Sequence, residues 1–430
     1  MLGSAVQNIV ALTDSIFLYY VSETDFAAIG FVGVFYLVIA SIGFGLSKGG
    51  QIMIARRVGE KEYVEVGKSF YALVYFALIL SVALFLFMQY GARPFFELFV
   101  HSEVIIDKSM EYLQPRSYGV FFSYTGMAIM ALYTGMARTA FIVVDTIILA
   151  VVNIVLNYGL IYGAWGLPEM GIAGAGLAST IAEITAFAVF FLYMTRDHGL
   201  RLLRIFRLPL PNPSLNLYWR LLSISSPAVA QSVLGIGSWF FFFGLIEHMG
   251  ERELAISNLV RIVYLMLSIP CWGYASGINT IVSNFIGMQK RQVVFPIIWK
   301  TAKITIGNTM LFALPVLIWP KFFLYPLLGK QDLTLLIEAQ PILLLLIPVL
   351  ALFAIGGIYL NGLTGTGAMG RGLWIMFVST VAYAVYVYLM VEVYHAALYY
   401  VWLADIIYWS IASSMSWFYL HSKKWHGQEV

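Results

Sequence analysis

An internal repeat constrains the fold of this chain more than any other feature. When the sequence is shifted by 228 residues, 23–59 aligns with 251–287 without a gap, and eight of the 37 positions are identical. The identities include three glycines, and each copy begins with acidic residues before a long apolar segment. Repeated apolar halves predict two similar helical bundles, which is the usual plan of a secondary transporter.

The apolar composition requires a membrane environment. Hydrophobic residues make up 61% of the 430 residues, charged residues make up 11%, and the mean hydropathy is +0.84. A water-soluble domain of this size needs more polar surface, and the apolar runs are too long for the alternating strands of a membrane barrel. We therefore predict an all-α polytopic membrane protein. Its one cysteine, Cys271, excludes an intrachain disulfide.

Twelve segments are long and apolar enough to cross a bilayer as helices. The predicted spans are 1–21, 26–54, 64–89, 109–134, 139–162, 171–194, 219–246, 254–285, 296–319, 335–360, 372–391 and 396–420.

The basic residues predict the orientation of these spans. Of the 25 Lys and Arg residues, 17 fall on the side of the N-terminus and seven on the opposite side, so both termini are expected to be cytoplasmic. The longest polar connector, 196–216, carries four arginines and three prolines. We therefore predict an N-terminal lobe over 1–195, a basic cytoplasmic linker over 196–218 and a C-terminal lobe over 219–430.

Polar side chains inside the spans mark the strongest candidate site. Asp14, Asn153 and Ser179 lie at similar depths in the first, fifth and sixth spans, within about one helical turn of one another. Asn157 and Glu183 follow Asn153 and Ser179 by four residues, on the same helix faces. Carboxylate and amide oxygens suit a hard cation such as Na⁺, and a buried carboxylate suits H⁺. The alternative is that these acids only hydrogen-bond neighbouring helices.

Short motifs along nearly the whole chain resemble those of a known family. The motifs are Thr13–Phe17, Gly45–Ser47, Ala55–Gly59, Asn153–Tyr158, Gly171–Ala178 and Thr364–Gly367. Their order and spacing resemble the MATE (multidrug and toxic compound extrusion) transporters of the MOP flippase superfamily. The resemblance implies a V-shaped fold of two pseudo-symmetric six-helix lobes, alternating access, and export of organic cations driven by entry of Na⁺ or H⁺.

The resemblance also implies a coupling-cation site in the first lobe. One branch of the family binds the cation with an aspartate of span one, an Asn-x-x-x-Asp pair of span five and a hydroxyl of span six. These positions correspond to Asp14, Asn153, Asn157 and Ser179, so Na⁺ is implied at the first three. The second acid of the pair is an amide in this chain, and Glu183 is expected to restore the missing charge.

The second lobe carries fewer acidic candidates. Gly235 stands where another branch has a glutamate, and no aspartate occurs in span ten. Under a shift of 226 residues, Asp405 in span twelve aligns with Ser179. Asp405 is either a cation anchor or the counter-ion of Arg261, and we favour the ion pair because a buried arginine needs a partner.

The function expected from these features is secondary antiport. We assign the substrate cavity to Gln7, Lys48, Arg116, Arg261 and Asp405. The expected substrate is a cationic, drug-like organic compound, exported in exchange for Na⁺ or H⁺. If the basic side chains of this set face the cavity, the alternative is a flippase for a lipid-linked or anionic substrate.

Two other classes are less favoured. An intramembrane enzyme needs a catalytic group at membrane depth, whereas the six histidines fall in or near loops and chain ends. A channel is disfavoured by the twofold repeat. We expect no cofactor beyond the coupling ion, no nucleic-acid partner, and a monomer in the cytoplasmic (inner) membrane.

Overall fold

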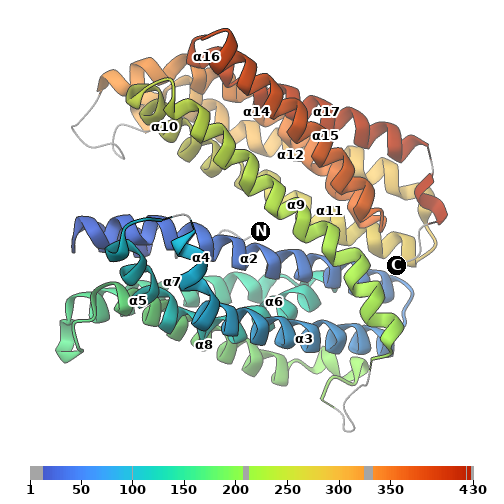
Figure 1. Ribbon diagram of the computed structural model, residues 1–430. Coiled ribbons are helices and arrows are strands. Elements are labelled where there is room, and N and C mark those ends of the chain that lie inside the picture. Colours follow the sequence, from blue (N-terminus) through green and yellow to red (C-terminus); the bar gives the residue numbers. More distant parts are fainter. Residues whose placement is uncertain (1–12, 99, 207–212, 324–332, 423, 428–430) are drawn as a thin grey trace. The chain divides into compact units, whose positions relative to one another are not determined.

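The computed structural model describes residues 13–98, 100–206, 213–323, 333–422 and 424–427, and all regular secondary structure in these ranges is helical (Figure 1). The prediction of an all-α protein is therefore confirmed. The chain forms two compact units, Met1–Val229 and Ala230–Val430.

The first unit begins with a helical segment over residues 13–19. Ser22 then caps the next helix by accepting the Asp25 N–H at 3.0 Å, and that helix ends with Arg56 and Arg57, as its dipole favours. The elements that follow the first segment are α2 (Glu23–Gly59), α3 (Tyr63–Leu86), η1 (Phe87–Gly91), α4 (Ala92–Glu97), α5 (Glu103–Ser117), α6 (Gly119–Gly135), α7 (Ala140–Tyr162), η2 (Ala164–Gly166), α8 (Gly171–Arg196) and η3 (His198–Leu203).

The second unit continues from a helix that the two units share. Its elements are α9 (Leu215–Glu247), α10 (Glu251–Leu267), α11 (Ile269–Gly287), η4 (Arg291–Val293), α12 (Val294–Ile318), α14 (Leu333–Gly365), α15 (Met369–Tyr388), η5 (Leu389–Val393), α16 (Leu398–Val401), α17 (Ala404–His421) and η6 (Lys424–Gly427).

The internal repeat is visible in the helix boundaries. Helix α2 spans Glu23–Gly59, and α10 with α11 spans Glu251–Gly287, which is the same interval after the shift of 228 residues. The first copy is one continuous helix, whereas the second bends by 45° at Ser268. Pro270 follows the bend and has no backbone N–H to continue the helix, while the equivalent residue of the first copy is Ile42.

The helices agree with the predicted spans. Within the described residues, eight helices are individually long and apolar enough to cross a membrane, and the bent pair α10–α11 makes a ninth. The predicted spans 109–134 and 396–420 correspond to the interrupted helices α5–α6 and α16–α17. The first predicted span is described from residue 13 onward.

The division between the two units falls inside α9. Ser225 donates to the Leu46 carbonyl at 3.4 Å, and Val229 packs against Gly45, so the first turns of α9 belong to the first unit. Part of the predicted linker is helical, as η3. The lobe limits at 195 and 219 remain a prediction.

Candidate functional site

The buried carboxylate of Asp14 collects polar side chains from three further helices. Asn157 of α7 donates to Oδ1 at 2.7 Å and Asn153 donates to the same oxygen at 3.4 Å. Ser179 of α8 and Tyr112 of α5 each donate to Oδ2 at 3.0 Å. All five side chains are buried. The packing of α8 against both α7 and α5 brings these groups together.

The ligands of Asp14 also bind one another. The Asn153 amide donates to Ser179 Oγ at 3.0 Å, and the Asn157 amide donates to Asn153 Oδ1 at 3.3 Å. Asn157 Oδ1 is buried and has no hydrogen-bond partner. A buried amide oxygen without a partner is costly, so this atom is a natural ligand for a cation or a bound proton.

This donor set fits a hard cation or a proton. The carboxylate, the amide oxygens and the hydroxyls supply oxygen ligands. A different kind of metal site, built from three or more His, Cys, Asp or Glu side chains, is absent from the described residues. Hydroxyl groups can reverse from donor to acceptor, and amide groups can rotate to present oxygen instead of nitrogen. The cluster can therefore solvate Asp14 in either charge state.

Glu183 does not bind Asp14 but forms a buried ion pair with Arg116. The guanidinium donates through Nη1 and Nη2 to the two carboxylate oxygens at 2.7 and 2.6 Å, and the two side chains are 1% and 3% exposed. The expectation that Glu183 restores the charge missing at Asn157 has no support in this geometry. Charge neutralisation explains the arrangement, because a buried carboxylate next to an arginine is far more stable paired than free.

The ion pair stands one turn from the Asp14 cluster. Arg116 and Tyr112 are four residues apart on α5, so they share a helix face. The Arg116 guanidinium lies over the Tyr36 ring, 4.0 Å from its centroid. A side chain at Gly119 would overlap Glu183 Oε2, so the glycine leaves room for the carboxylate.

A small cavity of about 50 Å³ lies beside the ion pair. It is lined by Glu183, by Asp145 of α7, by Ser123 and by aromatic and methionine side chains. Asp145 is buried, and its Oδ1 has no hydrogen-bond partner. The volume is sufficient for a few water molecules. Asp14, Glu183 and Asp145 are therefore three of the four buried carboxylates in the described helices of the first unit, and the fourth is Asp25 of α2.

The residues predicted to line a substrate cavity are divided between the two units, and their grouping into one cavity stays a prediction. Lys48 and Arg116 belong to the first unit, Arg261 and Asp405 belong to the second, and Gln7 lies outside the described residues. Arg116 is neutralised by Glu183, and Arg261 lies over the Phe243 ring at 4.7 Å from its centroid. Arg116 is thus a structural partner rather than a free cation.

The predicted ion pair between Asp405 and Arg261 is wrong. In the part of the chain that the structure describes, no ion pair or hydrogen bond reaches the Asp405 carboxylate, although it is only 8% exposed. Three tyrosines lie near it instead. They are Tyr264, Tyr383 and Tyr408. The shift that aligned Asp405 with Ser179 predicts a depth for Asp405 but carries no information on the rotation of its helix.

Tyr112 and Tyr36 are site residues that sequence reasoning missed. Tyr112 binds Asp14 directly, and Tyr36 covers Arg116. Tyr112 stands four residues before Arg116 in the fourth predicted span, and this spacing was the available signal. Aromatic residues are common in this chain, so that signal did not distinguish Tyr112 from the rest.

Comparisons with known proteins agree with the fold. The family model described as MatE matches residues 1–159 and 227–389. A probable multidrug resistance protein NorM of Thermotoga maritima is 22% identical over 99% of this chain and 91% of that protein. Another, from Synechocystis sp., is 24% identical over 72% of this chain and 66% of that protein.

Solved structures of transporters have the same fold. A crystal structure of MATE in complex with MaL6 superposes with a TM-score of 0.88 at 18% identity, over 98% of this chain and 93% of that one. A MOP superfamily transporter from Pyrococcus furiosus, described as having a binding pocket of reverse polarity, superposes with a TM-score of 0.84 at 18% identity, with the same two coverages.

Proposed function

Because this multi-pass membrane protein belongs to the MATE family of transporters, in the MOP superfamily, we propose that it is a multidrug efflux antiporter. It exports drug-like organic compounds, preferably cations, by alternating access, and Na⁺ or H⁺ enters in exchange. The coupling ion binds at Asp14, with Asn153, Asn157 and Ser179 as its other ligands. The relatives named above as multidrug resistance proteins support this assignment.

The observation that carries the proposal is the convergence of four donors on one buried carboxylate. An isolated ionised acid inside a membrane protein is expensive, and Asp14 receives hydrogen bonds from three helices besides its own. The ligands come from three different helices, so binding of a cation or a proton changes the contacts between helices. A ligand that favours one packing of these helices shifts the transporter toward that conformation.

The same geometry argues against an anionic or lipid-linked substrate. That alternative requires free positive charge from Lys48, Arg116 and Arg261. Arg116 is neutralised by Glu183 and Arg261 is partly buried over an aromatic ring. A cationic substrate remains the better fit.

The energy available from one coupling ion is sufficient for export. One elementary charge that crosses about 150 mV releases about 3.5 kcal/mol. Since about 1.4 kcal/mol corresponds to a tenfold ratio, this supports a substrate gradient of roughly a few hundredfold. The location that follows is the cytoplasmic (inner) membrane, with both termini in the cytoplasm. The chain works as a monomer, with a small organic substrate and no nucleic-acid partner.

The test is ethidium efflux from proteoliposomes, with Na⁺ and H⁺ gradients imposed separately. Wild-type protein should export ethidium under at least one gradient. Asp14→Asn keeps the shape of the side chain but removes its charge, so gradient-driven efflux should be lost. Retention of coupled efflux by a folded Asp14→Asn protein would refute this coupling site.

Glu169→Gln is the matched control. Glu169 is exposed in the loop before α8, and its neutralisation should leave efflux unchanged. Folding of every variant is checked by size-exclusion chromatography and circular dichroism. Absence of ethidium efflux from folded wild-type protein under both gradients would contradict cationic export.

A further inference from the structure

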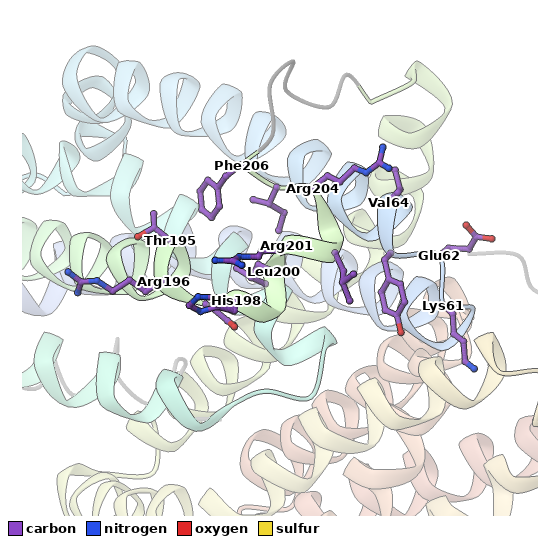
Figure 2. A pocket seen from close by; sticks show the side chains of 14 residues that line it. Lys61, Glu62, Val64, Thr195, Arg196, His198, Leu200, Arg201, Arg204 and Phe206 are labelled. Carbon is purple, nitrogen blue, oxygen red and sulfur yellow. The ribbon is translucent and has the colours of Figure 1, made fainter.

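A basic cavity of the first unit lies at one end of the helical bundle. Its volume is about 840 Å³, within the range of small-molecule sites. Its walls come from the turn between α2 and α3, from the last turn of α8 and from the segment that follows α8 (Figure 2). Four cationic residues line it. They are Lys61, Arg196, Arg201 and Arg204.

These four cations have no acidic partner among the described residues. No carboxylate there lies within ion-pair distance of any of them, and residues 207–212 contain no Asp or Glu. The lining includes two acids, Glu62 and Asp197. Asp197 accepts hydrogen bonds from Gly199 N at 2.8 Å and Tyr133 at 3.1 Å, and Arg138 lies 3.3 Å from it. The cavity therefore keeps a net positive charge.

The wall of the cavity is held in place by packing and hydrogen bonds. Tyr71 of α3 donates to the Ile205 carbonyl, and Leu203 packs on Gly67, where a side chain would overlap its carbonyl oxygen. Leu200, Leu203 and Ile205 are buried. Phe206 packs edge-on against Phe191 of α8. The cations are thus presented by an ordered structure.

Apolar side chains are exposed beside the cations. The exposed fraction is 66% for Leu202 and 48% for Phe206. It is 41% for Tyr63 and 40% for Val64. Figure 2 shows Arg201 and Phe206 on the side of Thr195, and Arg204 on the side of Val64. A free inorganic anion makes no contact with apolar side chains. A phospholipid binds through both surfaces, because its headgroup contacts cations and its acyl chains contact apolar side chains.

The cavity lies where lipid headgroups are expected, at the ends of two helices that are able to cross a membrane. Both α2 and α8 are apolar enough to cross a membrane, and the cavity begins where these two helices end. Basic pockets at the ends of membrane helices bind anionic headgroups. We propose that this cavity binds the phosphodiester headgroup of an anionic diacyl phospholipid, with the acyl chains against the exposed apolar side chains.

The first experiment measures which molecule stabilises the delipidated full-length protein in detergent. Phosphatidylglycerol should raise the thermal unfolding midpoint in a saturable manner. Phosphatidylcholine, which carries no net charge, and glycerol phosphate, which has no acyl chains, should not do so at the same concentration. Equal stabilisation by phosphatidylcholine would overturn the charge argument, and stabilisation by glycerol phosphate alone would overturn the lipid assignment.

The second experiment locates the site with a double variant. Arg201→Gln with Arg204→Gln should weaken the apparent affinity for phosphatidylglycerol about thirtyfold, which is about fivefold for each removed charge. The matched control is Lys290→Gln with Arg291→Gln, two exposed cations at the turn of the second unit that corresponds to the α2–α3 turn. This control should bind as the wild type does.

Equal weakening in the two double variants would overturn the proposal, because it would indicate binding to surface charge in general. A readout that does not depend on a variant uses a photoreactive phosphatidylglycerol on wild-type protein. Cross-links should fall within residues 61–64 and 195–206. Cross-links confined to other segments would also overturn the proposal.

Discussion

The two units have similar helices but differ in the hydrogen bonds and ion pairs that their buried carboxylates make. In the first unit, Asp14 receives four hydrogen bonds and Glu183 is paired with Arg116. In the second unit, Asp405 has no hydrogen bond or ion pair from any described residue and lies near three tyrosines. The two copies therefore have similar backbones but different polar partners around their buried acids. Ion coupling is assigned to the unit whose acid is solvated by protein.

The units also differ in where a helix is interrupted. The first unit has a continuous α2 and a break between α5 and α6 at Tyr118. The second unit has a break between α10 and α11, and a continuous α14 despite Pro341 and Pro348. The break in the first unit lies just after Arg116, so it separates the helical turn that carries the ion pair from the rest of the span.

The largest predicted difference in efflux is between variants that neutralise the buried acid of one unit or of the other. Asp14→Asn should lose gradient-driven efflux, whereas Asp405→Asn should retain it, because the second carboxylate has no ligand set to couple with. Ethidium efflux under separate Na⁺ and H⁺ gradients measures both. Loss of coupling in Asp405→Asn with coupling retained in Asp14→Asn would reverse the assignment.

The ion pair of the first unit should have a large effect on stability. Arg116→Met leaves Glu183 buried without its counter-ion and should lower the free energy of unfolding by about 3–5 kcal/mol. Arg93→Met is the control, because Arg93 faces three carboxylates but is 45% exposed, and surface pairs contribute about 0–1 kcal/mol. Thermal or denaturant unfolding in detergent compares the two. An equal decrease in the free energy of unfolding for the two variants would show that burial of the ion pair does not determine its contribution to stability.

A second acid beside Asp14 should strengthen cation binding. Asn157→Asp places a carboxylate next to Asp14, and a bound cation relieves the repulsion between them. We expect the affinity for Na⁺ to rise at least about tenfold, since like charges at this separation interact by more than about 1.4 kcal/mol. Sodium-dependent protection against thermal unfolding measures this. Asn216→Asp, exposed at the start of α9, adds the same charge elsewhere and should have no effect.

The smallest predicted effect belongs to Tyr112, one of the two site residues that sequence reasoning missed. Tyr112→Phe removes one hydrogen bond to Asp14 and should weaken coupling-ion binding by about 0.5–1.5 kcal/mol, or roughly two- to tenfold. Tyr162→Phe is the control, since it removes a hydrogen bond to the Phe17 carbonyl of the same N-terminal segment without touching Asp14. The half-saturating ion concentration for efflux separates the two variants, and an identical value for both would contradict a ligand role for Tyr112.

Sequence alone determined the helices and the level of the Asp14 cluster, which is the proposed coupling site. An apolar segment inside a membrane must satisfy its own backbone hydrogen bonds, so hydropathy predicts helices directly. The predicted spans 26–54 and 254–285 lie within the helical limits Glu23–Gly59 and Glu251–Gly287, which coincide with the two aligned copies of the repeat. Because helical rise is constant, counting residues placed Asp14, Asn153 and Ser179 at one depth, and the three are in contact.

Only the tertiary structure decided which side chains meet at that depth. Glu183 lies one turn from Ser179, yet its carboxylate binds Arg116 of α5 instead of joining the Asp14 cluster. Asp405 and Arg261 lie at comparable depths by residue count, yet they do not pair. Residue counting gives position along a helix, whereas a contact also depends on which helices are neighbours and how each is rotated about its axis. Packing of the whole unit determines both.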